Sequence, residues 1–294
     1  MIRKWLIVPA LVLAFAAVLA IWFSYRCSVP ETVALVRSDN GRMEIVDIEN
    51  GKPLECIINN PHKLPMSFEV VSWNGLAGCR KMVKRITGLG FGAFNCSSAR
   101  WDDAFLSLSR GKDIVLIQEA YLDRSFLSII EGFIPTCSFN MTRSFITDGT
   151  IANGVLTMST ADAESVYPML AREPVFPTPK SSLFTTFGFE GDDSVKLLVV
   201  NVHAVLMGSR NFRNQLQNVK DLIDEHNGPV LLAGDFNTMS ESRTNELRMF
   251  TNSHGALNEL RLEDGKDKRL KLNGRPLDFI FYRGLIPEEA YVID

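Results

Sequence analysis

Two polar residues follow a short apolar run in the C-terminal third of the chain. The run at 231–233 leads into Gly234, Asp235, Phe236 and Asn237. Because alternate side chains of an extended backbone point the same way, Asp235 and Asn237 are expected on one face while Phe236 turns toward the core. A carboxylate beside an amide suits a site that deprotonates a water while a donor steadies a phosphoryl oxygen. The alternative is an Asp/Asn turn that ends a strand.

A second carboxylate, Glu119, ends the apolar run Ile114–Gln118. Because a buried carboxylate without a partner is costly, Glu119 should meet a cation or a hydrogen-bond network. A hard cation such as Mg²⁺, which one or two carboxylates and several waters hold, suits it. Asn74 also closes an apolar run, so its amide is expected at the same end of the strands. Taken alone, Glu119 is more often a capped strand end than a metal ligand.

Two further polar residues lie at the ends of apolar runs. His203 closes one of them and shares a face with Asn201. A lone His at a strand end is usually structural, but near Glu119 and Asp235 it becomes a candidate phosphate-binding or acid group. Asp278 opens a very apolar run and needs a cationic or His partner, because a carboxylate buried alone costs several kcal/mol.

Short β-type runs that alternate with helical patterns must position these residues. Apolar residues at helical spacing between 212 and 223 predict a core-facing helix that stops before Gly228 and Pro229. Thr238 and Glu241 have capping-box spacing, so another helix is expected directly after 237. The pattern predicts a mixed α/β domain in which helices cover buried sheets. The expected strands are 68–73, 114–118, 154–158, 183–189, 196–203, 230–233 and 277–282.

Five of these segments, in their order along the chain, resemble the endonuclease/exonuclease/phosphatase superfamily. The resemblance spans roughly residues 67–294 and implies a four-layer α-β-β-α sandwich of the deoxyribonuclease I type. It also implies hydrolysis of a phosphate ester by a metal-aided, in-line water. Four segments look particularly like the YafD-like bacterial branch: Arg172-Glu173-Pro174, Lys180-Ser181, Asn201-Val202-His203-Ala204 and 274–284. The five segments are Ser72-Trp73-Asn74, Gln118-Glu119, Asn201-Val202-His203, Gly234-Asp235-Phe236-Asn237 and Leu277-Asp278-Phe279-Ile280.

By position, the resemblance implies that Glu119 is the main Mg²⁺ ligand with Asn74 nearby, and Mn²⁺ is the alternative ion. Asp235 would orient the water or handle its proton, and Asn237 would donate to a phosphate oxygen. The substrate class is a phosphate ester, for which nucleic acid and phospholipid head groups both stay open. No protein partner is inferred.

The same resemblance makes His203 a second phosphate or leaving-group contact and Asp278 the support of a further His. That His belongs to a Ser-Asp-His segment beyond the strand at 277–280, and this sequence does not contain the segment. We therefore expect an incomplete chain with little activity of its own. The alternative is a catalytically impaired, membrane-tethered binding or scaffold module.

The N-terminus carries an unbroken apolar run of 19 residues, Trp5–Phe23. At a rise of ~1.5 Å per residue this run can span a bilayer core of ~30 Å, so it predicts one transmembrane helix. A cleaved signal peptide is the alternative. A small excess of positive charge before the run favours a catalytic domain outside the cytoplasm, as in a bacterial periplasm, with the cytoplasmic side left open. The predicted organisation is an anchor at 1–24, a juxtamembrane connector at 25–66 and the catalytic domain at 67–294.

Charge and cysteine content narrow the function classes. The net charge of −3 argues against a non-specific nucleic-acid binder, which usually carries a basic excess. A basic cluster at 80–85 can meet phosphates or form an ordinary solvated surface. No cysteine has the spacing of a structural zinc site. Cys79 and Cys96 can form a disulfide outside the cytoplasm or stay thiols.

Overall fold

The structure, a computed structural model, describes the chain from residue 27 to residue 293 with several gaps. The predicted span at 5–23, the basic cluster at 80–85, Cys79 and Cys96 lie outside the described residues. Within the described part, no helix combines the length and the apolar character needed to cross a bilayer. The described ranges are 27–29, 33–39, 42–48, 52–75, 98–123, 126, 138–147, 149, 151–174, 178–253, 256–263 and 265–293.

The first sheet has eight strands, in the order β1-β8-β9-β7-β2-β3, and β6 pairs with β9 and with β5. Only the β5·β6 pair is parallel. The strands are β1 (Cys27–Ser28), β2 (Ala34–Asp39), β3 (Arg42–Asp47), β5 (Val70–Asn74), β6 (Ile114–Leu122), β7 (Phe139–Thr142), β8 (Phe145–Thr147) and β9 (Ile151–Ser159).

The second sheet has seven strands, in the order β14-β17-β13-β12-β11-β10-β4, and only its β12·β13 pair is parallel. The strands are β4 (Leu54–Glu55), β10 (Ser165–Ala171), β11 (Lys180–Phe189), β12 (Asp192–His203), β13 (Val230–Asp235), β14 (Asn258–Glu259) and β17 (Asp278–Arg283). A separate small hairpin precedes β17 and consists of β15 (Lys271–Leu272) and β16 (Arg275–Pro276).

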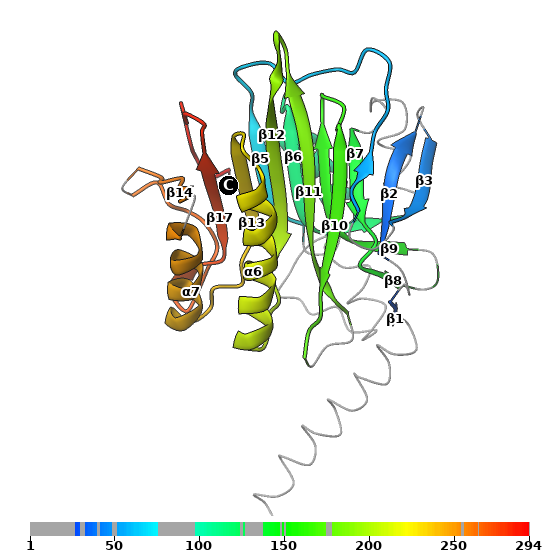
Figure 1. Ribbon diagram of the computed structural model, residues 1–294. Coiled ribbons are helices and arrows are strands. Elements are labelled where there is room, and N and C mark those ends of the chain that lie inside the picture. The colour runs from blue at the N-terminus through cyan, green and yellow to red at the C-terminus, as the bar shows by residue number, and fades with distance from the viewer. Residues whose placement is uncertain are drawn as a thin grey trace, which may run out of the picture.

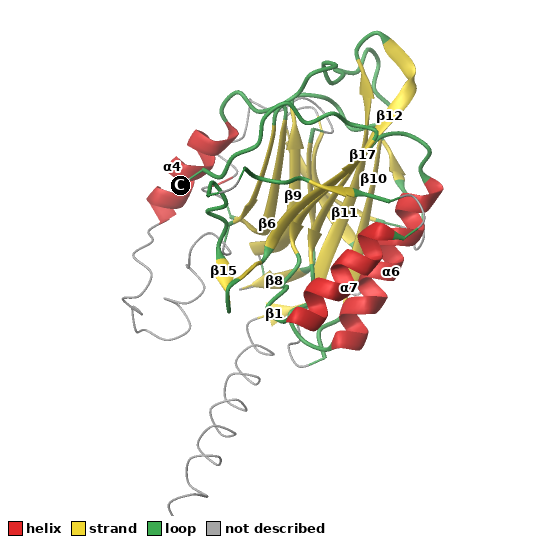
Figure 2. Ribbon diagram, turned by 90° about the vertical axis from the view of Figure 1, so that its left-hand side faces the viewer, coloured by secondary structure: helices red, strands yellow, loops and turns green. Residues whose placement is uncertain are grey.

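The two sheets pack face to face, and helices cover both outer faces (Figures 1 and 2). Leu116, Val199 and Leu231 belong to the apolar core between the sheets. Helix α6 (Ser209–Glu225), together with α7 (Glu241–Asn252), covers the second sheet, and α4 (Ser98–Ser109) buries Phe105 against the first. Each fully buried side chain of this kind contributes about 1.5–3 kcal/mol. The predicted four-layer α-β-β-α sandwich is therefore confirmed for the described residues.

The start of α7 differs from the sequence prediction. Its N-cap is Ser240, whose hydroxyl accepts a hydrogen bond from the Arg243 N–H, so the predicted capping box of Thr238 and Glu241 is wrong. The Thr238 hydroxyl instead donates to the carbonyl of Pro276 at 2.6 Å. This bond ties the segment after β13 to β16, which directly precedes β17.

The predicted connector at 25–66 contributes strands to both sheets. Strands β2 and β3 form an antiparallel hairpin that pairs with β7, and β4 pairs with β10. Leu35 and Val36 are buried in this hairpin, which gives the segment an apolar contribution to the core. Its described residues are therefore part of the sandwich.

Candidate active site

Strand pairing brings the predicted site residues to one end of the sandwich. In the parallel pair β12·β13, His203 lies opposite Asp235, and in the antiparallel pair β13·β17, Asp235 lies opposite Asp278. Asn74 ends β5 and donates from Nδ2 to Asp235 Oδ2 at 2.7 Å, which joins the two sheets. Asn74, His203, Asp235 and Asp278, which lie far apart in the sequence, therefore share one site.

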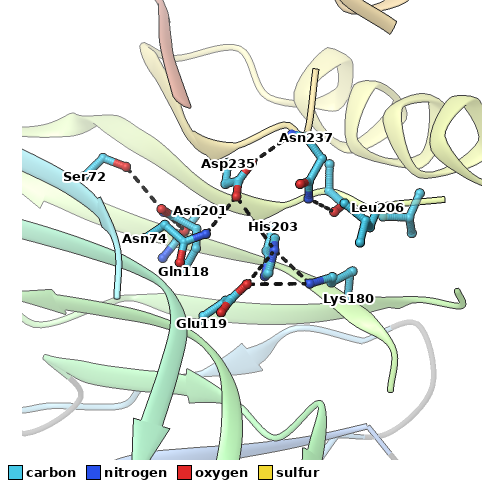
Figure 3. A network of polar contacts seen from close by, with 12 residues as sticks. Ser72, Asn74, Gln118, Glu119, Lys180, Asn201, His203, Leu206, Asp235 and Asn237 are labelled. Atoms are coloured by element: carbon cyan, nitrogen blue, oxygen red, sulfur yellow. Dashed lines mark hydrogen bonds and ion pairs between the residues drawn. The ribbon is translucent and has the colours of Figure 1, made fainter. Parts of the chain in front are cut away.

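A bulge in β6 turns Glu119 into this site. The register of β6 against β9 shifts between Ile117 and Ala120, and Glu119 has a positive φ of 51°. A bulge of this kind redirects a side chain that regular pleating would place elsewhere. Glu119 Oε1 lies 3.6 Å from His203 Nε2 and 3.9 Å from Lys180 Nζ (Figure 3).

The end of β13 is shaped so that Asp235 faces the site. Gly234 has φ 148°, and a Cβ there would lie 1.9 Å from the carbonyl oxygen of Val202, so only glycine fits. Asp235 Oδ1 accepts from the main-chain N–H of Asn237 at 2.8 Å. Asn237 itself has φ 49°, a left-handed conformation that Asn tolerates better than most residues. Its side-chain Nδ2 donates to the carbonyl of Ala204 at 2.8 Å, so one hydrogen of this amide holds the protein's own backbone.

Lys180 joins the site, although no motif or spacing in the sequence predicted a role for it. It opens β11, and its Nζ lies 2.9 Å from His203 Nε2. Burial, reinforced by the Lys180 charge, holds the pKa of His203 well below its usual range. His203 is therefore a neutral imidazole at neutral pH, and the ammonium group of Lys180 supplies the positive charge on this side.

The two central carboxylates are destabilised as anions. Burial raises the pKa of Glu119, with Lys180 opposing the shift and Asp235 adding to it. Burial also raises the pKa of Asp235, while hydrogen bonds from Asn237 and Asn74 oppose this shift. Like-charged groups that converge in a low-dielectric site are typical of functional sites, because folding alone gains nothing from them.

Asp278 lies beside Asp235 at the start of β17. Burial, and then the neighbouring Asp235 carboxylate, raise the pKa of Asp278 to about 7 against the opposing charge of Arg269. Arg269 donates to the main-chain carbonyl of Asp278 at 2.9 Å, and the Arg269 guanidinium lies over the Phe279 ring. The predicted need of Asp278 for a cationic or His neighbour is thus met only in part, by Arg269.

The other two described histidines have their contacts elsewhere. His62 Nδ1 lies 3.2 Å from Asp162, and His226 Nε2 lies 2.9 Å from the carbonyl oxygen of Lys196. His254 is not among the described residues. The further His that the resemblance implies for Asp278 therefore has no counterpart in the described part of the chain.

A buried pair of amide side chains, Gln118 and Asn201, lies next to the site, and no motif in the sequence predicted a role for it. Gln118 Nε2 donates to Asn201 Oδ1 at 2.7 Å and lies 3.3 Å from the Ser72 hydroxyl (Figure 3). Asn201 Nδ2 in turn donates to the carbonyl of Leu156 at 2.8 Å. Gln118 and Asn201 precede Glu119 and His203, so this pair fixes the two strand ends against each other across the sheets. The alternation that places Asn201 and His203 on one face of the strand could have predicted that Asn201 lies beside the site.

The donor set suits a hydrated hard cation. The Glu119 side chain is 30% exposed and Asn74 lies beside it, whereas the Asp235 side chain is only 6% exposed. Among the described residues, no group of three or more His, Cys, Asp and Glu side chains could hold a metal ion by itself. Mg²⁺ needs only one or two carboxylates and keeps several waters, whereas a closed zinc site needs four protein ligands. Glu119 and Asn74 thus fit the first kind of ion.

The sequence matches a known protein family and curated relatives. The sequence model of the endonuclease/exonuclease/phosphatase family matches residues 71–292. A UPF0294 protein of Klebsiella pneumoniae is 33% identical over 219 residues, which cover 71% of this chain and 77% of that protein. A UPF0294 protein of Erwinia tasmaniensis is 34% identical over 218 residues, or 71% of this chain and 76% of that one.

Solved structures show the same fold. The endonuclease/exonuclease/phosphatase from Bacteroides vulgatus aligns with a TM-score of 0.50 at 16% identity, covering 73% of this chain and 86% of that chain. The human Nocturnin catalytic domain aligns with a TM-score of 0.51 at 18% identity, covering 76% and 85%. At these identities the likeness shows the fold alone, and it supports the sandwich described above.

Proposed function

This chain belongs to the endonuclease/exonuclease/phosphatase family, and we propose that it cleaves a phosphate ester with a divalent metal ion held at Glu119 and Asn74. Members of this family are hydrolases that act on phosphate esters. The ion we propose is Mg²⁺, with Mn²⁺ as the alternative. The proposed substrate is a phosphodiester or phosphomonoester, from nucleic acid or from a phospholipid head group.

The observation that carries this proposal is the convergence of charged groups at the strand ends. Glu119, Asp235, His203 and Lys180 come from four different strands, and each lies within 4.0 Å of another. Two carboxylates with raised pKa values beside a neutral imidazole and an ammonium form a site with both acidic and basic capacity. Such a set suits a reaction in which a water loses a proton and a charged phosphoryl group must be held.

In this proposal Asp235 orients and deprotonates the attacking water. Its two oxygens are held by Asn74 and by the Asn237 main chain, so the carboxylate has a fixed direction. Burial raises the pKa of Asp235, which makes it a stronger proton acceptor than a solvated Asp.

In this proposal Lys180 and His203 receive the phosphoryl oxygens. The ammonium group provides charge-assisted hydrogen bonds, which are about twice as strong as neutral ones. The His203 ring, 4.0 Å from Asp235 Oδ2, adds a polar contact at the reacting phosphate or the leaving group. When bound at Glu119 and Asn74, a divalent metal ion would polarise a phosphoryl oxygen and offset developing negative charge.

A rate comparison tests this function. The 294-residue chain and its Asp235→Ala variant would be assayed on a chromogenic phosphodiester with Mg²⁺, with Mn²⁺ and with a chelator. We expect slow, metal-dependent hydrolysis by this chain and a rate at least about 100-fold lower still in Asp235→Ala, because Asp235 handles the proton. Asp221→Ala, which removes an exposed carboxylate on α6, is the matched control and should leave the rate unchanged. Equal rates for the parent and Asp235→Ala would overturn the enzyme assignment.

Two substrate arms separate the open sources of the phosphate ester. A single-stranded oligonucleotide and a phospholipid in mixed micelles would be compared at equal phosphate concentration. Cleavage of one and not the other assigns the substrate class. Complete inactivity on all three substrates would favour the non-catalytic, membrane-tethered alternative.

A further inference from the structure

The connection between β12 and α6 begins directly after His203 and is buried at its start. Ala204 and Val205 are both 0% exposed. A buried connection must satisfy its main-chain N–H and C=O groups without water. Four side chains from separate parts of the chain do so here: Glu173 after β10, Gln215 on α6, Asn237 after β13 and Arg243 on α7.

Glu173 holds two successive N–H groups of this connection. Its Oε1 accepts from Leu206 N at 2.5 Å and its Oε2 accepts from Met207 N at 3.1 Å. The Glu173 residue is 9% exposed, so both oxygens of a buried carboxylate accept hydrogen bonds from main-chain N–H groups.

Arg243 holds the carbonyl groups of the same two peptides. Its guanidinium donates to the carbonyl of Leu206 at 2.9 Å and to that of Val205. The guanidinium also lies 4.1 Å from the centroid of the Phe212 ring, and the residue is 7% exposed. The carboxylate of Glu173 therefore binds the N–H groups of the two peptides before and after Leu206, and the guanidinium of Arg243 binds their C=O groups.

The clamped connection is joined to the site at its other end. Gln215 Nε2 donates to the carbonyl of His203 at 3.1 Å. Ala204 N donates to the carbonyl of Asp235 at 2.8 Å, and the Ala204 carbonyl accepts from Asn237. A displacement of the clamped peptides would therefore move the backbone that carries His203, Asp235 and Asn237.

The segment Arg172-Glu173-Pro174 is fixed on the connection by two further contacts. Asn211 Nδ2 donates to the carbonyl of Arg172 at 3.0 Å. Gly208, with φ 80°, leaves room for the Pro174 ring, because a Cβ there would lie 3.0 Å from Pro174 Cγ. Two buried charges are an expensive means of holding an ordinary surface turn, since neutral side chains can bond the same groups.

We propose that Glu173 and Arg243 are positioning residues, which clamp the two peptides around Leu206 so that His203 is held in place for the reaction. This role rests on the proposed function, because it assigns the clamp to the phosphate-facing imidazole. The pair touches no substrate atom in this role.

Two conservative substitutions test the clamp in the 294-residue chain, each with a matched control. Glu173→Gln offers one acceptor oxygen to two N–H groups, and Glu190→Gln makes the same change at an exposed position. Arg243→Lys keeps the charge but loses the planar fork, and exposed Arg248→Lys on the same helix is its control. The first readout is the His203 ring signal in NMR spectra of histidine-labelled protein at fixed pH, identified by its absence in His203→Gln. The second is kcat and KM on the chromogenic phosphodiester.

We expect both clamp variants to shift or broaden the His203 signal and to lower kcat about 10- to 100-fold with KM changed less than about twofold. Both controls should match the parent. An unchanged His203 signal in a folded clamp variant overturns the proposal, and so does a shifted signal with an unchanged kcat. If Glu173→Gln fails to fold, Arg243→Lys carries the test. If the parent hydrolyses nothing, the proposed function fails, while the His203 signal still decides whether the clamp positions the ring.

Discussion

Lys180 sets the charge of the site at the residue scale. Its ammonium group lies 2.9 Å from His203 Nε2 and 3.9 Å from Glu119 Oε1, so it balances one carboxylate. The same position lets it bond a phosphoryl oxygen. No spacing rule places Lys180 there, because its contact with His203 depends on how β11 and β12 pair.

Replacement of Lys180 by Met should lower kcat/KM for the chromogenic phosphodiester. Loss of a charged hydrogen bond costs about 1.5–3 kcal/mol, which predicts a fall in kcat/KM of about 10- to 100-fold. Steady-state kinetics on Lys180→Met check this, with Lys220→Met on α6, where the ammonium group bonds Asp224, as the control. An unchanged kcat/KM in Lys180→Met would remove the phosphate-binding role of this lysine.

Asp278 predicts a pH dependence of stability. Its pKa is raised from 3.8 in the unfolded chain to about 7 in the folded protein, a difference worth about 4 kcal/mol. The folded state therefore binds the proton more tightly, and stability falls as pH rises from about 4 to about 7. Asp278→Asn should lack this loss, so its free energy of unfolding should exceed that of the parent by an amount that grows over this range.

Urea unfolding in metal-free buffer at pH 4.5 and pH 8 measures the Asp278 effect. Asp267→Asn is the control with the opposite sign, because the hydrogen bond from Arg269 lowers the pKa of Asp267 to about 2. The Asp267 contribution is lost only as pH falls from about 4 toward 2, so removal of this carboxylate should destabilise the protein by nearly the same amount at pH 4.5 and at pH 8. A constant difference between Asp278→Asn and the parent at both pH values would contradict the account.

At the element scale, strand ends and their irregularities make the site. The apolar runs predicted β5, β6, β9, β11, β12, β13 and β17, and α6 was predicted from its helical spacing. The bulge at Glu119 and the cap at Ser240 were missed, because they depend on pairing partners and on tertiary bonds such as that of Thr238 with Pro276. The sequence therefore predicted which strands carry the site but not the local turns that aim its side chains.

Gly234 tests how closely β12 and β13 must approach. Gly234→Ala places a Cβ 1.9 Å from the Val202 carbonyl oxygen, so we expect a loss of about 3 kcal/mol or more, or no folding. Gly191→Ala has a positive φ of 78° with nothing within 4 Å of the added Cβ, so strain alone should cost about 1–2 kcal/mol. Urea unfolding of both variants separates the clash from the strain, and equal losses would show that the clash at Gly234 is relieved.

At the scale of the whole molecule, the site lies at the end of the sandwich where β1 is found. β12 and β13 run toward this end, and β1 starts at Cys27, shortly after the apolar run at 5–23 (Figure 1). We propose that this run anchors the protein in a membrane. The site would then face the bilayer, with the domain outside the cytoplasm.

Membrane fractionation checks the anchor. In expressing bacteria, the 294-residue chain should stay with membranes after an alkaline carbonate wash, and its mass should include residues 1–26. Leu13→Arg with Ala16→Arg should release it, because each Arg at the centre of a span costs about 2.5–3.5 kcal/mol. A shortened, released protein from the parent gene would instead identify a cleaved signal peptide.

The central claim is that Glu119 holds a metal ion for phosphate-ester hydrolysis, and a Mg²⁺ titration of the hydrolysis rate tests it most directly. The parent rate should rise and saturate with Mg²⁺, whereas Glu119→Gln should retain about a hundredth or less and show no such rise. A parent rate that is the same in chelator as in Mg²⁺, or a Glu119→Gln variant that titrates like the parent, would contradict the claim.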